Sequence, residues 1–304
     1  MLVRQMNGAR QVASLMANSE MDAQKRRAWL KRAARWFAVL GLLYVMLRWF
    51  EHSQIYQPSR EFEASPTELG RAFEEVRFKA SDGVALHGWF FPANTNSPRA
   101  HLVFLICHGN GGNVSHRLGL SAALLATGAG VFVFDYRGYG RSEGRPGEEG
   151  TYRDAQAAHA WLRQKGFRGE RIVAFGESLG GGVVSELALR ETLGGVVLQS
   201  TFTSMPEIGA EVFPWLPVRL ISTIKYDTRA KLPRIRVPVL VMHSRADDLA
   251  RFHHGERNFA AANNPKFFCE LRGAHNEALW TQPQFCEAIE KFLKLPGLGE
   301  NGQK

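Results

Sequence analysis

Residues 171–190 read RIVAFGESLGGGVVSELALR, and the order of residue types in this stretch decides the fold. The run at 171–175 is short, apolar and followed at once by glycine, which predicts a buried strand. GESLG (176–180) is a G-x-S-x-G pattern centred on Ser178, and the residues after it favour a helix. A strand, a sharp turn and a helix form a nucleophile elbow, which lifts a serine hydroxyl above the sheet. Ser178 is therefore the predicted nucleophile.

The chain holds a second G-x-S-x-G pattern, GRSEG (140–144), centred on Ser142. A bare match to so short a pattern is weak evidence, so the context has to decide. The strand predicted at 131–134 ends well before Ser142, and Arg-Pro-Gly follows the pattern where an elbow needs a helix. We therefore interpret Ser142 as a structural residue of a glycine-rich loop.

Short apolar runs alternate with helix-like segments after residue 75. The other predicted strands are 84–91, 101–107, 131–134, 195–199, 238–243 and 266–272. The predicted helices are 115–126, 151–166, 178–190 and 276–293. Continuous apolar strands separated by amphipathic helices predict a doubly wound α/β fold, with a mostly parallel sheet covered on both faces. Active-site residues are then expected at the C-terminal ends of the strands.

A serine nucleophile needs a general base, and the base needs an acid that orients it. In folds with a nucleophile elbow, the acid and then the histidine follow the serine along the chain. His275 stands in a loop between the last predicted strand and the last predicted helix, so it is the predicted base. Asp247 and Asp248 follow the strand at 238–243, and either is a candidate acid. The remaining histidines after Ser178 are interpreted as a strand-end residue, His243, and two surface residues, His253 and His254.

The order of motifs along residues 50–294 resembles the α/β-hydrolase superfamily. The motifs are HGNGGN (108–113), DYRGYGRSEG (135–144), GESLG (176–180), PVLVMHSRADD (238–248) and GAHN (273–276). Within the superfamily, the chain is most similar to a small-lidded branch with an N-terminal membrane anchor. That branch lies near the serine-aminopeptidase-like clan and includes protein-depalmitoylating thioesterases. The resemblance implies an α/β-hydrolase fold and a serine hydrolase.

The resemblance also assigns roles within the site. It implies Asp247 as the acid, with Asp248 as the alternative, although Ser244 stands where the family has glycine. An oxyanion hole needs two backbone donors, and the N–H of Leu179, directly after the nucleophile, is one expected donor. The resemblance places the other at Asn110. His108 is expected to hold this loop, and no metal or organic cofactor is implied.

The net charge of +9 is concentrated at the N-terminus. Residues 1–60 contain ten Lys/Arg and three Asp/Glu, which leaves the rest of the chain nearly neutral. A nearly neutral domain with a basic leader argues against nucleic-acid binding. The chain has three cysteines, Cys107, Cys269 and Cys286. They are too few and too scattered for a disulfide framework or a zinc site.

Residues 25–52 are predicted to form a membrane anchor or an amphipathic helix. The uncharged run at 36–47 is shorter than the roughly 20 residues that span a bilayer, but the flanking Arg35 and Arg48 can snorkel towards the interfaces. A cleaved signal peptide is the alternative, and no A-x-A-like site follows the run. Most of the nearby basic residues precede the uncharged run, and positive charge resists translocation across the membrane. We therefore expect the N-terminus in the cytoplasm and the catalytic domain on the periplasmic or other extracytoplasmic side.

The expected domain organisation is a basic mobile tail (1–24), the anchor, a linker (53–75), a hydrolase domain (76–295) and a C-terminal tail (296–304). Inside the hydrolase domain, residues 200–237 are expected to form a small cap.

The expected reaction is hydrolysis of an ester or thioester bond in a small acyl or lipid-like substrate. Phe213, Trp215 and Leu216 in the cap are candidates for an apolar acyl pocket, although core packing explains them equally well. An amidase or peptidase of the same fold is one alternative function. A non-catalytic membrane scaffold is another, but it would not need a nucleophile, a base and an oxyanion loop together.

Overall fold

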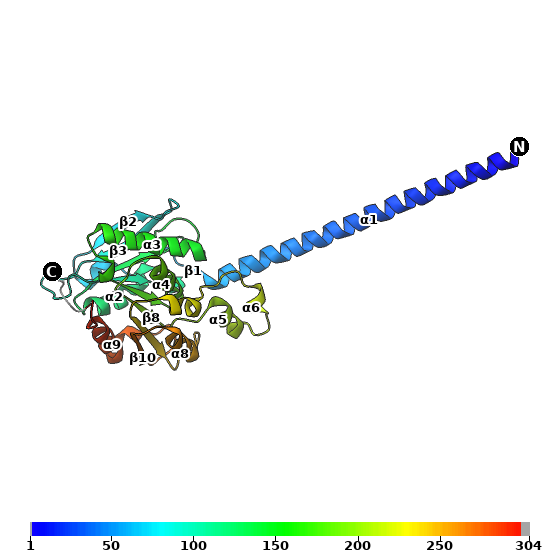
Figure 1. The fold of residues 1–304 in the computed structure, drawn as a ribbon. Helices are drawn as coiled ribbons and strands as arrows, with labels where there is room; N and C mark the ends of the chain where they lie inside the picture. Colours follow the sequence, from blue (N-terminus) through cyan, green and yellow to red (C-terminus); the bar gives the residue numbers. More distant parts are fainter. Residues whose placement is uncertain (1, 299–304) are drawn as a thin grey trace. The chain divides into compact units, whose positions relative to one another are not determined.

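The structure is a computed structural model that describes residues 2–298. The chain divides into two compact units, Met1–Gln54 and Ile55–Lys304. The first unit is one uninterrupted helix, α1 (Leu2–Ile55), as Figure 1 shows. This helix contains the predicted anchor at 25–52, and residues 2–24, which we expected to be a mobile tail, belong to the same helix. The stretch Lys25–Ile55 is long and apolar enough to cross a membrane, by length and composition alone.

The second unit is built on an eight-stranded sheet with the order β10-β9-β8-β7-β4-β6-β3-β2. The strands are β2 (Glu74–Lys79), β3 (Ala85–Phe91), β4 (Val103–Cys107), β6 (Gly130–Asp135), β7 (Ile172–Glu177), β8 (Gly195–Gln199), β9 (Val239–Ser244) and β10 (Lys266–Leu271). All neighbouring strands are parallel except at β3, which runs antiparallel to β2 and β6. The predicted mostly parallel α/β sheet is therefore confirmed.

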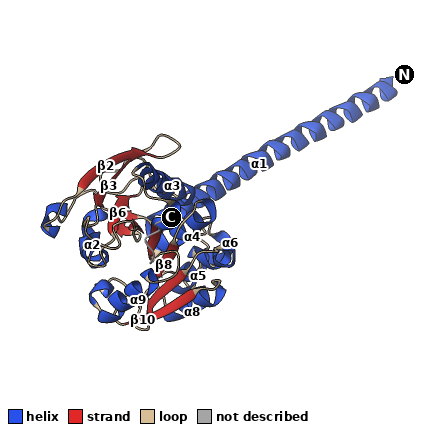
Figure 2. Ribbon diagram, turned by 60° about the vertical axis from the view of Figure 1, so that its left-hand side comes forward, coloured by secondary structure: helices blue, strands red, loops and turns tan. Residues whose placement is uncertain are grey.

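Helices cover both faces of the sheet (Figures 1 and 2). Side chains of α3 (Glu148–Gln164), α4 (Leu179–Arg190) and the end of α8 (Phe252–Ala261) pack into one hydrophobic core. Side chains of α2 (Leu118–Leu125) and α9 (Pro283–Leu293) pack into the other. The strands supply both cores because successive side chains point to opposite faces. On β4, for example, Leu105 belongs to the first core and Phe104 to the second.

The segment that we expected to be a linker, 53–75, is part of the packed unit from Ile55 onwards. Tyr56 is buried, and its hydroxyl is hydrogen-bonded to that of Tyr226 at 2.9 Å. A two-residue strand, β1 (Gln57–Pro58), then pairs in parallel with β5 (Gly111–Gly112). Packing also continues past the expected boundary at 295, because Leu298 is buried in the second core. The expected tail lies outside the described residues from 299 onwards.

Gly180 lets the first turn of α4 lie against the end of β4. A Cβ atom at this position would collide with the backbone carbonyl of Cys107 and approach that of His108 to 2.9 Å. Backbone atoms cannot rotate away as a side chain can, so Gly180→Ala must push α4 and β4 apart. Overpacking of this kind lowers the free energy of unfolding by about 1–3 kcal/mol or more. Urea unfolding of the detergent-solubilised chain, followed by tryptophan fluorescence, measures the loss.

Gly147→Ala is the matched control for this prediction. Nothing lies within 4 Å of a Cβ atom there, and the φ of Gly147 is −176°, which any residue adopts. Gly147 is the N-cap of α3, where alanine is less favoured than glycine, so the free energy of unfolding should fall by no more than about 1 kcal/mol. A Gly180→Ala chain as stable as Gly147→Ala would contradict the close approach of α4 to β4.

Candidate active site

Ser178 lies between β7 and α4, at the C-terminal edge of the sheet. Its φ of 50° and ψ of −112° are strained for a residue with a side chain, as a nucleophile elbow requires. Two backbone hydrogen bonds hold it there: the Ser178 N–H donates to the Gln199 carbonyl at 2.8 Å, and the Gly181 N–H donates to the Ser178 carbonyl at 3.0 Å. The turn thus presents the Ser178 hydroxyl in one direction.

His275 and Asp247 complete a hydrogen-bonded chain with Ser178. The Nε2 atom of His275 lies 3.0 Å from Ser178 Oγ, and its Nδ1 atom lies 2.8 Å from Asp247 Oδ2. A carboxylate only accepts hydrogen bonds, so Nδ1 carries the proton and Nε2 is left to accept from the Ser178 hydroxyl. All three side chains are at least nine-tenths buried. The structure therefore brings together the nucleophile, base and acid expected from the sequence.

The two candidate acids contact different atoms of His275. Asp247 accepts backbone N–H groups from Leu249 and Ala250 in addition to the imidazole proton, which fixes its carboxylate. Asp248 instead accepts the backbone N–H of His275 at 3.0 Å. That hydrogen bond lowers the pKa of Asp248. Asp247 alone is placed to orient the ring, while Asp248 fixes the loop that carries it.

Ser244, which departs from the family's glycine, also joins the two loops. Its hydroxyl donates to the Gly273 carbonyl at 2.6 Å and accepts the Ala246 N–H at 3.1 Å. The substitution therefore adds a connection between the turn after β9 and the loop before His275.

The loop 108–113 runs close to Ser178, because a Cβ atom on Gly109 would come within 3.6 Å of Ser178 Cβ. His108 Nδ1 donates to the carbonyl of Gly109 at 2.7 Å. Because the peptide bond is planar, fixing this carbonyl also fixes the direction of the Asn110 N–H, which belongs to the same peptide group. The bond from Gly181 to the Ser178 carbonyl fixes the Leu179 N–H in the same way. Among the described residues, neither the Asn110 nor the Leu179 N–H donates a hydrogen bond to the protein, so both can serve a ligand.

His108 itself is fully buried and packs on two tyrosines. Its ring centroid lies 4.4 Å from that of Tyr136 and 5.2 Å from that of Tyr139. Burial and the nearby charge of Arg117 lower its pKa to about 4, so the ring is neutral near pH 7. The expectation that His108 supports the loop agrees with these contacts.

A partly buried ion pair, absent from our sequence analysis, ties the same loop to the end of β7. Glu177, directly before Ser178, accepts from Arg117 Nε at 2.9 Å and from the Gly109 N–H at 3.4 Å. Arg117 also donates to the Gly111 carbonyl at 2.9 Å. Burial alone would raise the pKa of Glu177, but the charge and hydrogen bond of Arg117 outweigh it and lower the pKa. The adjacency of Glu177 to Ser178 was the one sequence signal for this role.

The segment before β2 also contributes to the loop, which the sequence analysis missed. The N–H of Gln57 donates to the Asn110 carbonyl at 3.1 Å, and Tyr139 donates to the same carbonyl at 2.8 Å. The N–H of Ser59 donates to the Gly112 carbonyl at 3.1 Å. The glycine-rich loop 108–113 is thereby held in one conformation by hydrogen bonds from residues 57–59 and from Tyr139.

Ser142 is fully buried away from this constellation. Its hydroxyl donates to the Asp135 carbonyl at 2.7 Å and accepts the His87 N–H at 2.9 Å. The structural interpretation of Ser142 agrees with these bonds. The interpretation of His254 as a surface residue was wrong, because the start of α8 turns it inward and buries it completely. His253 is partly exposed, and His243 is buried with Nε2 2.6 Å from the Ala250 carbonyl.

The expected cap at 200–237 contains three short helices, α5 (Met205–Val212), α6 (Val218–Ile221) and α7 (Thr228–Lys231). Trp215 is 74% exposed, and its ring packs edge-on to that of Phe213. Trp215 therefore belongs to neither the hydrophobic core nor an enclosed pocket. Leu220 on α6 is also exposed.

Comparison with known proteins places this geometry in context. A family model described as alpha/beta hydrolase fold matches residues 103–224. An uncharacterized protein of Mycobacterium tuberculosis, Rv2307c, is 38% identical over 253 residues, covering 82% of this chain and 89% of the relative. The Arabidopsis thaliana alpha/beta hydrolase domain-containing protein WAV2 is 30% identical, with coverages of 71% and 78%. The esterase Pf2001 of Pyrococcus furiosus superposes with a TM-score of 0.65 at 22% identity, covering 78% of this chain and 98% of that one.

Because the two aspartates make different contacts, replacing each by asparagine should affect turnover differently. Asp247→Asn keeps the shape of the side chain but favours the wrong imidazole tautomer, so turnover of an acyl ester should fall by up to about 10⁴-fold. Asp248→Asn retains an oxygen that accepts the His275 N–H and should change turnover little. Steady-state kinetics on both variants measures the difference. The reverse order of effects would assign the orienting role to Asp248.

Proposed function

This chain belongs to the α/β-hydrolase superfamily, and from that premise we propose that it is a serine hydrolase that cleaves ester or thioester bonds. The hydrogen-bonded order Ser178–His275–Asp247 is the observation that carries the proposal. These side chains come from three separate strand ends, and each is hydrogen-bonded in the direction that proton transfer requires. No metal or organic cofactor is needed for this chemistry.

In the acylation step, Ser178 Oγ attacks the carbonyl carbon of the substrate. His275 Nε2 takes the hydroxyl proton as the Oγ–C bond forms, and Asp247 stabilises the imidazolium. The resulting tetrahedral intermediate then collapses and breaks the bond to the leaving alcohol or thiol. His275 gives its proton to that leaving group, so an acyl-serine and a neutral imidazole remain.

The oxyanion of the intermediate would be bound by the N–H groups of Asn110 and Leu179. Fixed donors aimed at developing charge are worth about 10²–10³ in turnover for each donor. The planar peptides held by His108 and Gly181 support this assignment, because the donors are already oriented before substrate binds. Water then attacks the acyl-serine, with His275 again taking and returning one proton, and the free acid leaves.

The exposed apolar residues of the cap favour a substrate with an apolar acyl group. Trp215 and Leu220 are exposed on a segment that follows β8, one of the strands beside the nucleophile strand. Exposed apolar residues at a cap suit a small acyl or lipid-like substrate, with an ester or thioester preferred over an amide.

Membrane attachment is the second part of the proposal. The stretch Lys25–Ile55 in α1 supports a single-pass anchor, and the cluster of basic residues at its start favours a cytoplasmic N-terminus. The catalytic unit would then act on the extracytoplasmic side, close to lipid-derived substrates.

Replacement of each candidate serine separates a nucleophile from a structural hydroxyl. Ser178→Ala should lower turnover of a p-nitrophenyl ester by about 10⁶-fold, because no other oxygen can form the acyl intermediate. Ser142→Ala should keep most of the turnover but lower the free energy of unfolding by about 1–3 kcal/mol, because it leaves the buried His87 N–H unpaired. A Ser178→Ala chain that retains turnover would refute the mechanism.

Cell fractionation tests attachment and orientation. The full chain should remain with membranes through salt and carbonate washes, whereas a version lacking residues 1–54 should not. In intact bacterial spheroplasts, added protease should digest the catalytic unit of the full chain, because that unit faces outwards. Release by carbonate would contradict a spanning anchor. Protection of the catalytic unit until lysis would contradict the orientation.

A further inference from the structure

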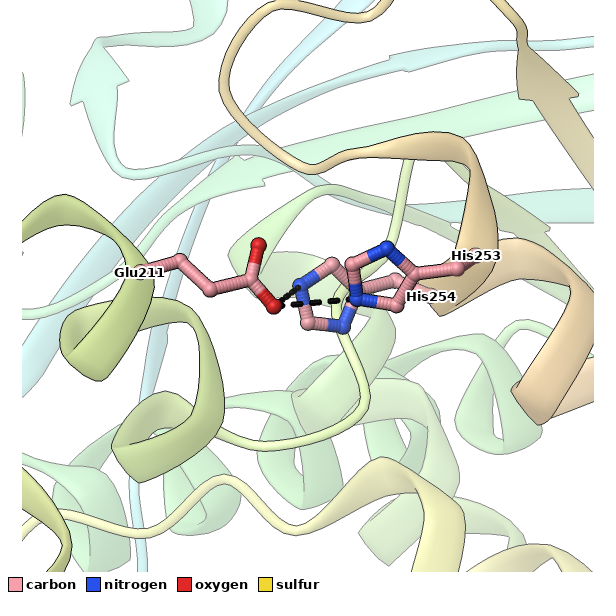
Figure 3. A group of neighbouring side chains, drawn as sticks. All are labelled: Glu211, His253 and His254. Atoms are coloured by element: carbon pink, nitrogen blue, oxygen red, sulfur yellow. Dashed lines mark hydrogen bonds and ion pairs between the residues drawn. The ribbon is translucent and has the colours of Figure 1, made fainter.

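Outside the candidate active site, three side chains that commonly bind metals converge between the cap and α8. Glu211 lies near the end of α5, and His253 and His254 are adjacent residues in the first turn of α8 (Figure 3). One ligand atom from each residue lies within 4.8 Å of the others. Glu211 Oε1 is 2.9 Å from His253 Nε2 and 3.4 Å from His254 Nε2. Two imidazoles and a carboxylate thus face one point.

Two polar atoms in this cluster are buried without a hydrogen bond. They are His254 Nε2 and Glu211 Oε2. The His254 side chain is completely buried, and its Nε2 points towards the carboxylate of Glu211, beyond a good hydrogen-bond distance (Figure 3). The Arg251 guanidinium comes no closer than 3.9 Å to Glu211 Oε2. Buried polar atoms are normally paired, and a bound cation would satisfy both of these.

The other ring nitrogen of His254 is held by Thr203. Its Nδ1 atom is 2.8 Å from Thr203 Oγ1, and that hydroxyl is also bonded to the Glu207 carboxylate. The backbone N–H of Thr203 lies against the same nitrogen at 3.2 Å. These contacts fix the ring orientation, as the partner of the second nitrogen usually does for a histidine that binds a metal. A metal on Nε2 would require the proton on Nδ1, where it is donated to the Thr203 hydroxyl.

We propose that Glu211, His253 and His254 form a binding site for one divalent transition-metal ion, with Zn²⁺ the best fit. Two imidazole nitrogens and one carboxylate oxygen make a His₂Glu set, which leaves the fourth position of a tetrahedral ion open to water. The chemistry of these ligands disfavours Ca²⁺ and Mg²⁺, which prefer all-oxygen sites.

The bound ion would tie the cap to the catalytic sheet. Glu211 comes from cap helix α5, whereas α8 begins just after the loop that carries Asp247. That loop is itself bonded to the sheet, because His243 on β9 contacts the Ala250 carbonyl at 2.6 Å. Metal binding therefore fixes α5 against the element that follows the acid. No residue of the proposed hydrolytic machinery is a ligand, so the metal site stands independently of that activity.

Titration with Co²⁺ tests the site directly. The full chain, purified in detergent without a polyhistidine tag, should bind one Co²⁺ with the visible absorption bands of a tetrahedral ion, and one equivalent of Zn²⁺ should abolish them. His253→Gln and Glu211→Gln each remove a ligand but keep a polar group of similar size. Removing a residue that hydrogen-bonds to a metal ligand typically lowers metal affinity by about 10–100-fold. Removing a ligand itself should therefore weaken Co²⁺ binding by about 100-fold or more.

His101→Gln is the matched control, because His101 is a partly buried histidine that contacts the Leu298 carbonyl and has no part in the cluster. It should bind Co²⁺ as the parent chain does. Zn²⁺ should also raise the Tm of the parent and of His101→Gln, but not that of His253→Gln. Since the His253 side chain is partly exposed, this variant should fold even if Glu211→Gln does not. Absence of the bands at millimolar Co²⁺, or equal binding by His253→Gln and the parent, would show a hydrogen-bonded cluster without a metal and overturn the proposal.

Discussion

The site depends on one close approach, that of the first turn of α4 to the backbone at the end of β4. Only glycine at position 180 permits it, because any Cβ would meet the carbonyl oxygens of Cys107 and His108. The approach sets Ser178 and the Leu179 N–H directly beside the loop that starts at His108. The strained φ of Ser178 costs about 1–3 kcal/mol, which the surrounding backbone hydrogen bonds and buried helix must offset.

The sheet determines which side chains can meet Ser178. Strands β9 and β10 are parallel neighbours, with Ser244 paired to Leu271, so the chain leaves both at the same edge. Asp247 and His275 follow within four residues of those strand ends and are held by hydrogen bonds to each other and to the backbone. A further hydrogen bond, from the Ser244 hydroxyl to the Gly273 carbonyl, also joins the two loops. Asp247 and His275 are therefore positioned together by the loops after β9 and β10.

The sequence predicts the parts of this arrangement whose signals are local. Strands β4, β6, β7, β8 and β9 are buried on both faces, so each is a continuous apolar run that stands out. Strand β2 escaped prediction because it is an edge strand in which only Val76 is buried. The pairing of β1 with β5, the ion pair of Arg117 with Glu177 and the inward turn of His254 all depend on residues far apart in the chain. Such contacts follow from the tertiary structure and leave no periodic pattern.

Mass spectrometry of a covalent adduct tests the central claim most directly. A fluorophosphonate reacts with an activated serine, and trypsin separates the two candidates: Ser178 falls in the peptide 172–190, and Ser142 in the peptide 142–153, because the bond between Arg145 and Pro146 is not cleaved. Fragmentation of the longer peptide distinguishes Ser178 from Ser185. The account predicts one phosphonyl group on Ser178 of the full chain and none on Ser142. An adduct on Ser142, or an unmodified Ser178 after prolonged exposure to excess reagent, would contradict it.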